Sequence, residues 1–161
     1  MGRYAEKLHI VPVFVPQAST ATAGYEAQSV ALKNAHWVTF LVNWGDITTD
    51  STDTLTFRVE SSTAAGSTTN ATAQTFTYRL AAAITGDNWG DATSASSVAV
   101  TAAANDSMAL VIDVDPAAVT AADTDAKYLN LAIDAVIESG YVSAWALIED
   151  RYPQSEHLTS T

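Results

Sequence analysis

The chain of 161 residues contains no cysteine, only seven lysine and arginine residues, and no apolar run long enough to span a bilayer. Without cysteine, disulfide bonds, thiolate metal sites and cysteine nucleophiles are excluded, so packing must hold the fold. Eighteen aspartates and glutamates give a formal net charge of −11, which would repel phosphate backbones, so nucleic acid is not an expected partner. The first residues lack the apolar segment of a secretory signal, so neither general export nor a membrane partner is expected.

The stretch 141–153 is apolar on both alternating faces and then turns charged. Its aromatic and β-branched residues after Gly140 favour a strand, although a short helix also fits the spacing. One face would carry Val142, Ala144, Ala146 and Ile148, and the other Tyr141, Ser143, Trp145 and Leu147. A strand that is apolar on both faces needs a second layer on one side and a further layer or another protein chain on the other.

Alternating apolar residues predict further strands at 25–32, 37–44, 55–59, 76–80, 108–114 and 127–137. The strands around Arg58 and Arg79 resemble each other, so we expect antiparallel neighbours with both arginines facing outward. In the strand 127–137, Leu129, Leu131 and Ile133 should face inward, and Asn130 and Asp134 outward. Asp115 and Pro116 suit the N-cap and the first position of a helical turn that runs through Val119.

About eight strands without a long helix predict an all-β chain with a single β-sandwich or jelly-roll-like domain. We expect an extended N-terminal arm at residues 1–16, the sandwich domain at 17–152 and a polar C-terminal tail at 153–161. Pro12 and Pro16 remove backbone donors, as in edge strands. The segment 8–16 is therefore either an edge strand of its own domain or an arm that pairs with a neighbouring chain.

Residue patterns for catalysis or metal binding are scarce in this sequence. The three histidines share no metal-binding spacing: His9, His36 and His157. Four aspartates could supply oxygen ligands to calcium, but capping and solubility are the simpler interpretation: Asp113, Asp115, Asp123 and Asp125. We therefore predict no catalytic residue, no metal and no cofactor, and do not expect an enzyme.

The four tryptophans could form a sugar-stacking platform of the kind that carbohydrate-binding sandwiches use. Three of them lie in strands of dense apolar pattern, so core packing is the simpler prediction: Trp37, Trp44 and Trp145. Trp89 lies in the turn 86–90, where it is either folded back as a lid or exposed for contact.

Six segments, taken in order, resemble small proteins found among the head genes of tailed bacteriophages, the capsid decoration or cement proteins: 4–13, 36–45, 76–80, 114–116, 127–131 and 149–154. The resemblance implies a structural virion protein, assembled in the host cytoplasm, that binds the outer surface of an icosahedral shell. It also implies a homotrimer that locks neighbouring copies of the major capsid protein together against internal DNA pressure. An acidic chain without evident catalytic groups suits such a role.

With this family in view, three sets of contact residues are candidates. The capsid contact would be the arm, through Leu8, Ile10, Val11, Pro12, Val13, Phe14 and Pro16. The oligomer interface would lie on the last strand and its end, through Tyr141, Trp145, Leu147, Arg151 and Tyr152. Trp89 is a further exposed contact candidate. The alternatives are a carbohydrate-binding module that uses Trp89 and one strand-face tryptophan, and a head-fibre or tail component.

Overall fold

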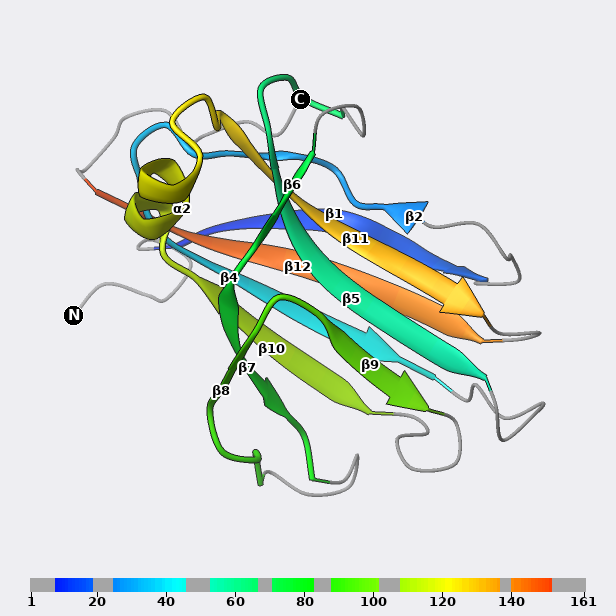
Figure 1. Ribbon diagram of the computed structural model, residues 1–161. Helices are drawn as coiled ribbons and strands as arrows, with labels where there is room; N and C mark the ends of the chain where they lie inside the picture. Colours follow the sequence, from blue (N-terminus) through cyan, green and yellow to red (C-terminus); the bar gives the residue numbers. More distant parts are fainter. Residues whose placement is uncertain are drawn as a thin grey trace.

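The computed structural model describes residues 8–18, 25–45, 53–66, 71–82, 88–101, 108–136 and 140–151. In these ranges, twelve strands form two antiparallel sheets that pack face to face, with one short helix at an end of the sandwich (Figure 1). The predicted all-β sandwich is confirmed. Strands outnumber the expectation because several are only two or three residues long. No helix within the described ranges is long and apolar enough to cross a membrane.

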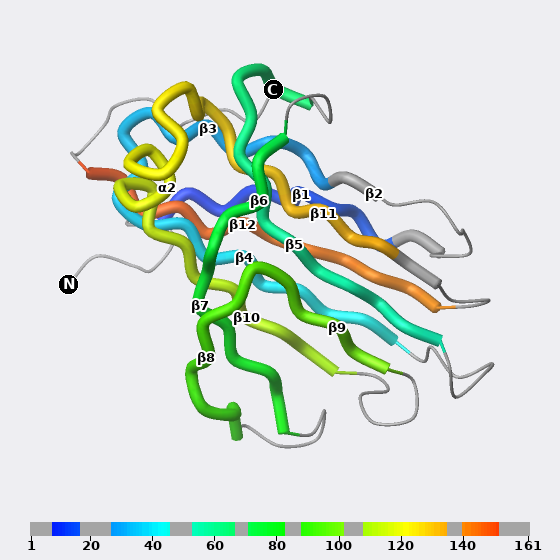
Figure 2. Tube along the Cα trace, viewed as in Figure 1, coloured from blue at the N-terminus to red at the C-terminus, as the bar shows by residue number. Residues whose placement is uncertain are grey.

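The first sheet contains six strands, which lie side by side along the rear layer in Figure 2. Their order is β1 (Leu8–Ala18), β12 (Tyr141–Asp150), β4 (Ala35–Trp44), β10 (Ala109–Val114), β7 (Phe76–Leu80) and β8 (Thr93–Ala95). The predicted strand 141–153 is thus β12, which ends at Asp150 and lies between β1 and β4. β12 is therefore an inner strand of the first sheet, with a paired strand on each side.

The second sheet is built around the long strands β11 (Tyr128–Val136) and β5 (Thr54–Ser62). Its path runs from β2 (Tyr25–Glu26) through β11 and β5 to β6 (Thr72–Gln74). The short strand β3 (Val30–Ala31) pairs with β11, and β9 (Val98–Thr101) pairs with β5.

The core lies between the sheets and follows the period-two pattern of the sequence. On β4, Val38, Phe40 and Val42 are fully buried, while the alternate residues point away from the core. Trp44 of the first sheet meets Phe57 of the second with ring centroids 5.5 Å apart. The other large buried side chains come from the long strands of both sheets: Leu55, Leu110, Ile112, Leu129, Leu131, Ile133 and Ile148. The inward residues predicted on β11, Leu129, Leu131 and Ile133, are confirmed. On β12 the buried face is the one that carries Val142, Ala144, Ala146 and Ile148.

The predicted pairing of the two arginine-containing strands is wrong. β5, which carries Arg58, belongs to the second sheet, whereas β7, which carries Arg79, belongs to the first. β5 pairs antiparallel with β11, β6 and β9, and the chain crosses to the first sheet between Gln74 and Phe76. Figure 1 shows this segment running diagonally between the layers. Two similar strands thus lie in different sheets because one crossover residue separates β6 from β7.

Helix α2 (Pro116–Ala122) closes one end of the sandwich. Asp115 is the N-cap, and its carboxylate accepts a hydrogen bond from the Ala117 N–H at 2.8 Å, as predicted. The helix continues to Ala122, past the predicted end at Val119, which is buried against the core. At the C-terminal end, Asp123 accepts a hydrogen bond of 2.5 Å from the buried Ser61 hydroxyl.

Asn130 is a second correction. It lies on the outer side of β11 as predicted, but it is fully buried, and its amide donates to the Ser62 hydroxyl at 3.3 Å. Asp134, four residues further along the same strand, is half-buried and faces outward as expected. Strand alternation tells which side of a sheet a residue occupies, but burial depends on what covers that side.

Residues 8–18 form the edge strand β1, hydrogen-bonded along β12 from Leu8 opposite Glu149 to Ala18 opposite Tyr141. Of the two predictions for this segment, an edge strand of its own domain or an arm that pairs with a neighbouring chain, the structure shows the edge strand. The strand ends at Ala18, two residues past the predicted arm boundary at residue 16. Two register shifts and two prolines interrupt it, and the Val13 carbonyl accepts a hydrogen bond from the Gln28 N–H at 2.8 Å. Bulges and prolines are devices that prevent an edge strand from pairing with another chain.

Candidate functional site

Large apolar side chains are exposed mainly on three neighbouring strands of the first sheet. Seven such side chains are more than one-third exposed among the described residues: Ile10, Val15, Trp37, Leu41, Trp89, Tyr141 and Trp145. All except Trp89 lie on β1, β12 or β4. A concentration of this kind, with polar residues around it, is typical of an interaction surface.

The strand register brings these residues together in rows across the sheet. Pro12 is opposite Trp145, Trp145 opposite Leu41, and Leu41 opposite Val111. In the next row, Ile10 is opposite Leu147, which is opposite Thr39. We call this surface the outer apolar face and define it as Leu8, Ile10, Pro12, Trp37, Leu41, Val111, Trp145 and Leu147. It has no covering layer among the described residues.

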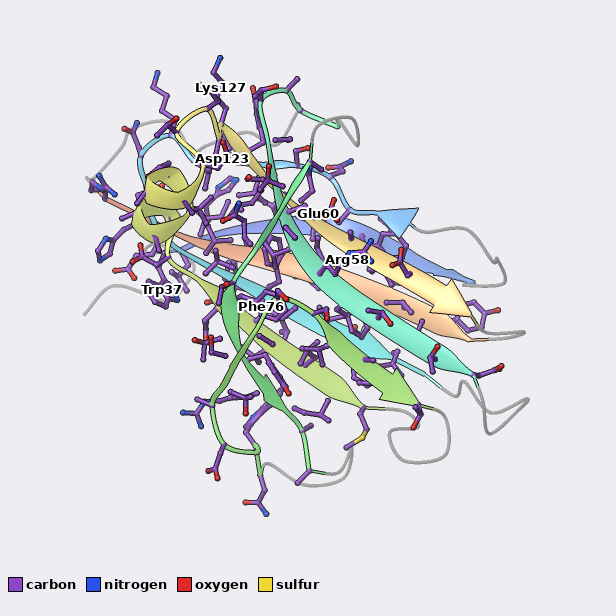
Figure 3. The ribbon with its side chains drawn as sticks, in the orientation of Figure 1. Trp37, Arg58, Glu60, Phe76, Asp123 and Lys127 are labelled. Carbon is purple, nitrogen blue, oxygen red and sulfur yellow. The ribbon has the colours of Figure 1, made fainter. Side chains whose placement is uncertain are left out.

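The outer side of the second sheet has the opposite character. Its long strands present threonine and charged residues, among them Thr56, Arg58, Glu60 and Asp134. Arg58 forms ion pairs with Asp134 and, at 3.3 Å, with Glu60. Figure 3 labels Arg58 and Glu60 on this sheet. Burial by itself would lower the pKa of Arg58, but the hydrogen bonds and negative charges of Asp134 and then Glu60 outweigh burial and raise it. The outer side of the second sheet is therefore polar, whereas the outer side of the first sheet is apolar.

Trp37 is held at the border of the outer apolar face, near the end of the first sheet beside α2 (Figure 3). Its indole Nε1–H donates to Asp113 Oδ1 at 3.3 Å, and the Thr39 hydroxyl donates to the same oxygen at 2.6 Å. Asp113 lies on β10, so the hydrogen bond holds the polar edge of the indole toward that strand. The ring remains 39% exposed.

A depression of about 250 Å³ opens beside this indole. Three adjacent strands line it, through Leu8, Trp37, Thr39, Leu147 and Glu149. Glu149 is exposed and lies directly between Leu8 and Trp37 in the register. The depression thus combines apolar walls, one aromatic ring, one hydroxyl and one carboxylate.

The structure divides the residues predicted for the capsid-contact arm. Leu8, Ile10 and Pro12 lie on the outer apolar face, and Pro16 is exposed further along β1. Val11, Val13 and Phe14 are buried in this chain's own core, so their assignment to a partner contact is corrected. Because of alternation and the bulges, the side chains of β1 lie on both sides of the sheet. The prediction had assigned all seven residues to one contact.

The residues predicted for the oligomer interface lie mainly on β12. Tyr141 and Trp145 are exposed, Leu147 is half-buried and Arg151 is exposed just after the strand. Tyr152 lies outside the described residues. Since Trp145 and Leu147 are opposite Pro12 and Ile10, residues predicted for two separate interfaces belong to one continuous surface.

The tryptophans differ from the prediction of core packing. Only Trp44 is buried, whereas Trp37 and Trp145 are 39% and 43% exposed on the outer apolar face. Trp37 is thus a surface residue that was predicted to pack in the core, and Leu41 on the same face is exposed as well. The signal that could have identified them is the alternation with Thr39 and Asn43, polar residues that mark a face without a covering layer. Trp89 is also exposed, at a bridge with Ala81.

Three of the four aspartates considered as calcium ligands accept hydrogen bonds from this chain's own groups. Asp113 accepts from Trp37 and Thr39, Asp115 caps α2, and Asp123 accepts from Ser61. Within the described ranges, no three histidine, aspartate or glutamate side chains are placed to hold a metal ion.

The fold and this surface together define a class: an all-β sandwich with one polar and one apolar outer side. Comparisons of the chain with protein-family models, curated proteins and solved structures found no match.

Proposed function

We propose that this chain is a structural protein that binds a larger protein assembly through the outer apolar face. The single observation that carries the proposal is that six of the seven large apolar side chains exposed among the described residues lie on β1, β12 and β4. Four of the six belong to the outer apolar face: Ile10, Trp37, Leu41 and Trp145. Surfaces of this kind are favourable only when a partner covers them. The assembly that the sequence resemblance implies is the outer surface of a tailed-phage capsid, and we adopt it as the proposed partner.

The size of the face supports a protein partner. Four strands at ordinary spacing and three rows of side chains cover roughly 400 Å². A standard protein interface buries about 800 Å² on each side, with an apolar centre and a polar rim. The outer apolar face has the dimensions of such a centre. Its rim is supplied by Asp113, Glu149, Asn43 and Ser143.

The mode of attachment that these features favour is contact through the face. Strand addition at β1 would require a free, regular edge, and bulges, prolines and the hydrogen bond from Gln28 work against it. Apolar contact across a sheet face needs no free backbone groups. Under this proposal, the contacts that bridge capsid subunits and the contacts of the homotrimer share the outer apolar face.

The test is binding of the purified chain to purified phage heads that lack it. The heads come from the encoding phage, after the chain has been stripped off or its gene deleted. We expect saturable co-sedimentation with heads, at a stoichiometry set by the capsid lattice, and increased resistance of the heads to heat. Recovery of the chain on tails or fibres would favour the tail-component alternative. Absence of the chain from whole virions would contradict the proposal.

A carbohydrate-binding module is the second candidate function, because Trp37 and Trp145 are exposed on one side of the sheet. Exposed tryptophan rings are suitable stacking platforms for pyranose rings. A glycan panel distinguishes the two: saturable binding of a defined oligosaccharide, lost in Trp145→Ala, would favour the module.

A further inference from the structure

From the depression beside Trp37, we infer that the outer apolar face recognises an arginine side chain presented by its protein partner. The inference rests on the proposed function, because it names what the partner contributes. The test of arginine recognition uses the isolated chain, so this inference and the proposed function can fail separately.

The lining of the depression matches the parts of an arginine side chain. Leu8 and Leu147 provide apolar walls for the aliphatic stem, which long basic residues bury readily. Trp37 offers an indole face over which a planar guanidinium can stack. Glu149 provides the carboxylate, which can accept two parallel hydrogen bonds from the guanidinium fork.

The binding elements are available in the free chain. Among the described residues, neither Glu149 nor Asp113 forms an ion pair. The hydrogen bond from Trp37 to Asp113 fixes the indole before any ligand arrives, so little ordering is required on binding. The Thr39 hydroxyl is already directed to Asp113, which leaves Glu149 as the carboxylate that faces a ligand.

Charge complementarity selects a cationic ligand. The chain has a formal net charge of −11, Glu149 lines the depression, and Asp113 is hydrogen-bonded to Trp37 in its wall. A basic residue on a partner protein would be attracted to the depression by this charge, whereas an acidic residue there would be repelled. A lysine would satisfy the charge but would lack the planar group that matches the indole and the carboxylate together.

The test is a titration of the isolated chain with the peptide acetyl-Gly-Gly-Arg-Gly-Gly-amide, followed by NMR of the four indole N–H signals. The Trp37→Phe variant identifies the signal of Trp37. We expect the arginine peptide to shift that signal, the lysine peptide to bind more weakly and the neutral citrulline peptide to leave it unchanged. Glu149→Gln should weaken arginine binding about tenfold, as expected for the loss of a charge-assisted hydrogen bond.

The matched control is Asp91→Asn, which makes the same change of charge at an exposed position beside β8, on the far side of the first sheet. It should bind the arginine peptide as the parent chain does. Equal binding of arginine and citrulline peptides, or equal weakening by Glu149→Gln and Asp91→Asn, would overturn the inference. So would a Trp37 shift caused by neutral sugars and absent with arginine. None of these outcomes would decide whether the chain binds heads, which is measured separately.

Discussion

Trp145→Ser is expected to lower the affinity of the chain for heads by about 30-fold or more, the effect of removing a central aromatic anchor from an interface. Trp145 occupies the middle of the outer apolar face, between Pro12 and Leu41 in the register. Its side chain is exposed in the free chain, so the free energy of unfolding should change by about 1 kcal/mol or less. Affinity is measured by co-sedimentation with heads, and stability by urea denaturation.

Arg58→Ser on the second sheet is the matched control for this substitution. It also shortens a large, partly exposed side chain on an outer sheet surface, but on the polar side of the sandwich. Loss of its exposed ion pairs should cost little stability, and head binding should be unchanged. Equal losses of binding in both variants, or full binding by Trp145→Ser, would contradict the assignment of the interface to the outer apolar face.

Phe14→Ala is expected to destabilise the chain by about 3 to 5 kcal/mol, whereas Val15→Ala should change stability by about 0.5 kcal/mol or less. The two residues are consecutive on β1, but Phe14 is 5% exposed and packs in the core, while Val15 is 62% exposed. Urea unfolding, monitored by circular dichroism, measures both. A small effect of Phe14→Ala would show that β1 is dispensable, as an arm would be.

The position of β1 also changes how a truncation must be interpreted. Deletion of residues 1–16 would remove Val11, Val13 and Phe14 from the core together with the backbone pairing to β12. We therefore expect the truncated chain to unfold, because the loss approaches the whole stability of an ordinary domain. Loss of head binding after such a deletion would not identify a contact, and point substitutions at Ile10 or Pro12 are the informative changes.

Much of the fold could be predicted because side-chain alternation is a local property of the sequence. The apolar residues of β4 and β12 alternate at period two, and in each strand the residues that alternation puts together on one face are buried together. The helix start at Asp115 and Pro116 was equally local, since one side chain and one fixed backbone angle determine it.

Strand partners could not be predicted in this way, because pairing is decided by distant parts of the chain. Arg58 and Arg79 have similar local sequences, yet they lie in different sheets. The pairing of β1 with β12 joins residues close to opposite ends of the chain. Alternation gives the side of each strand and leaves its neighbours undetermined.

The sequence also could not predict whether the strand face that points away from the core is exposed or covered. Trp37 and Trp145 were predicted to pack in the core because an apolar side chain on a strand is usually covered, but both are exposed. Asn130 is the reverse case, a polar residue predicted to face solvent that is buried. Only the arrangement of both sheets shows that nothing among the described residues covers the two exposed tryptophans and that Asn130 is enclosed.

The most direct test of the outer apolar face is residue-by-residue hydroxyl-radical footprinting of the chain, free and bound to heads. We predict that Trp37 and Trp145, exposed in the free chain, lose most of their reactivity on binding, while Trp89 keeps its own. Undiminished reactivity of Trp37 and Trp145 on heads, with protection confined to Trp89 or to the second sheet, would contradict the account.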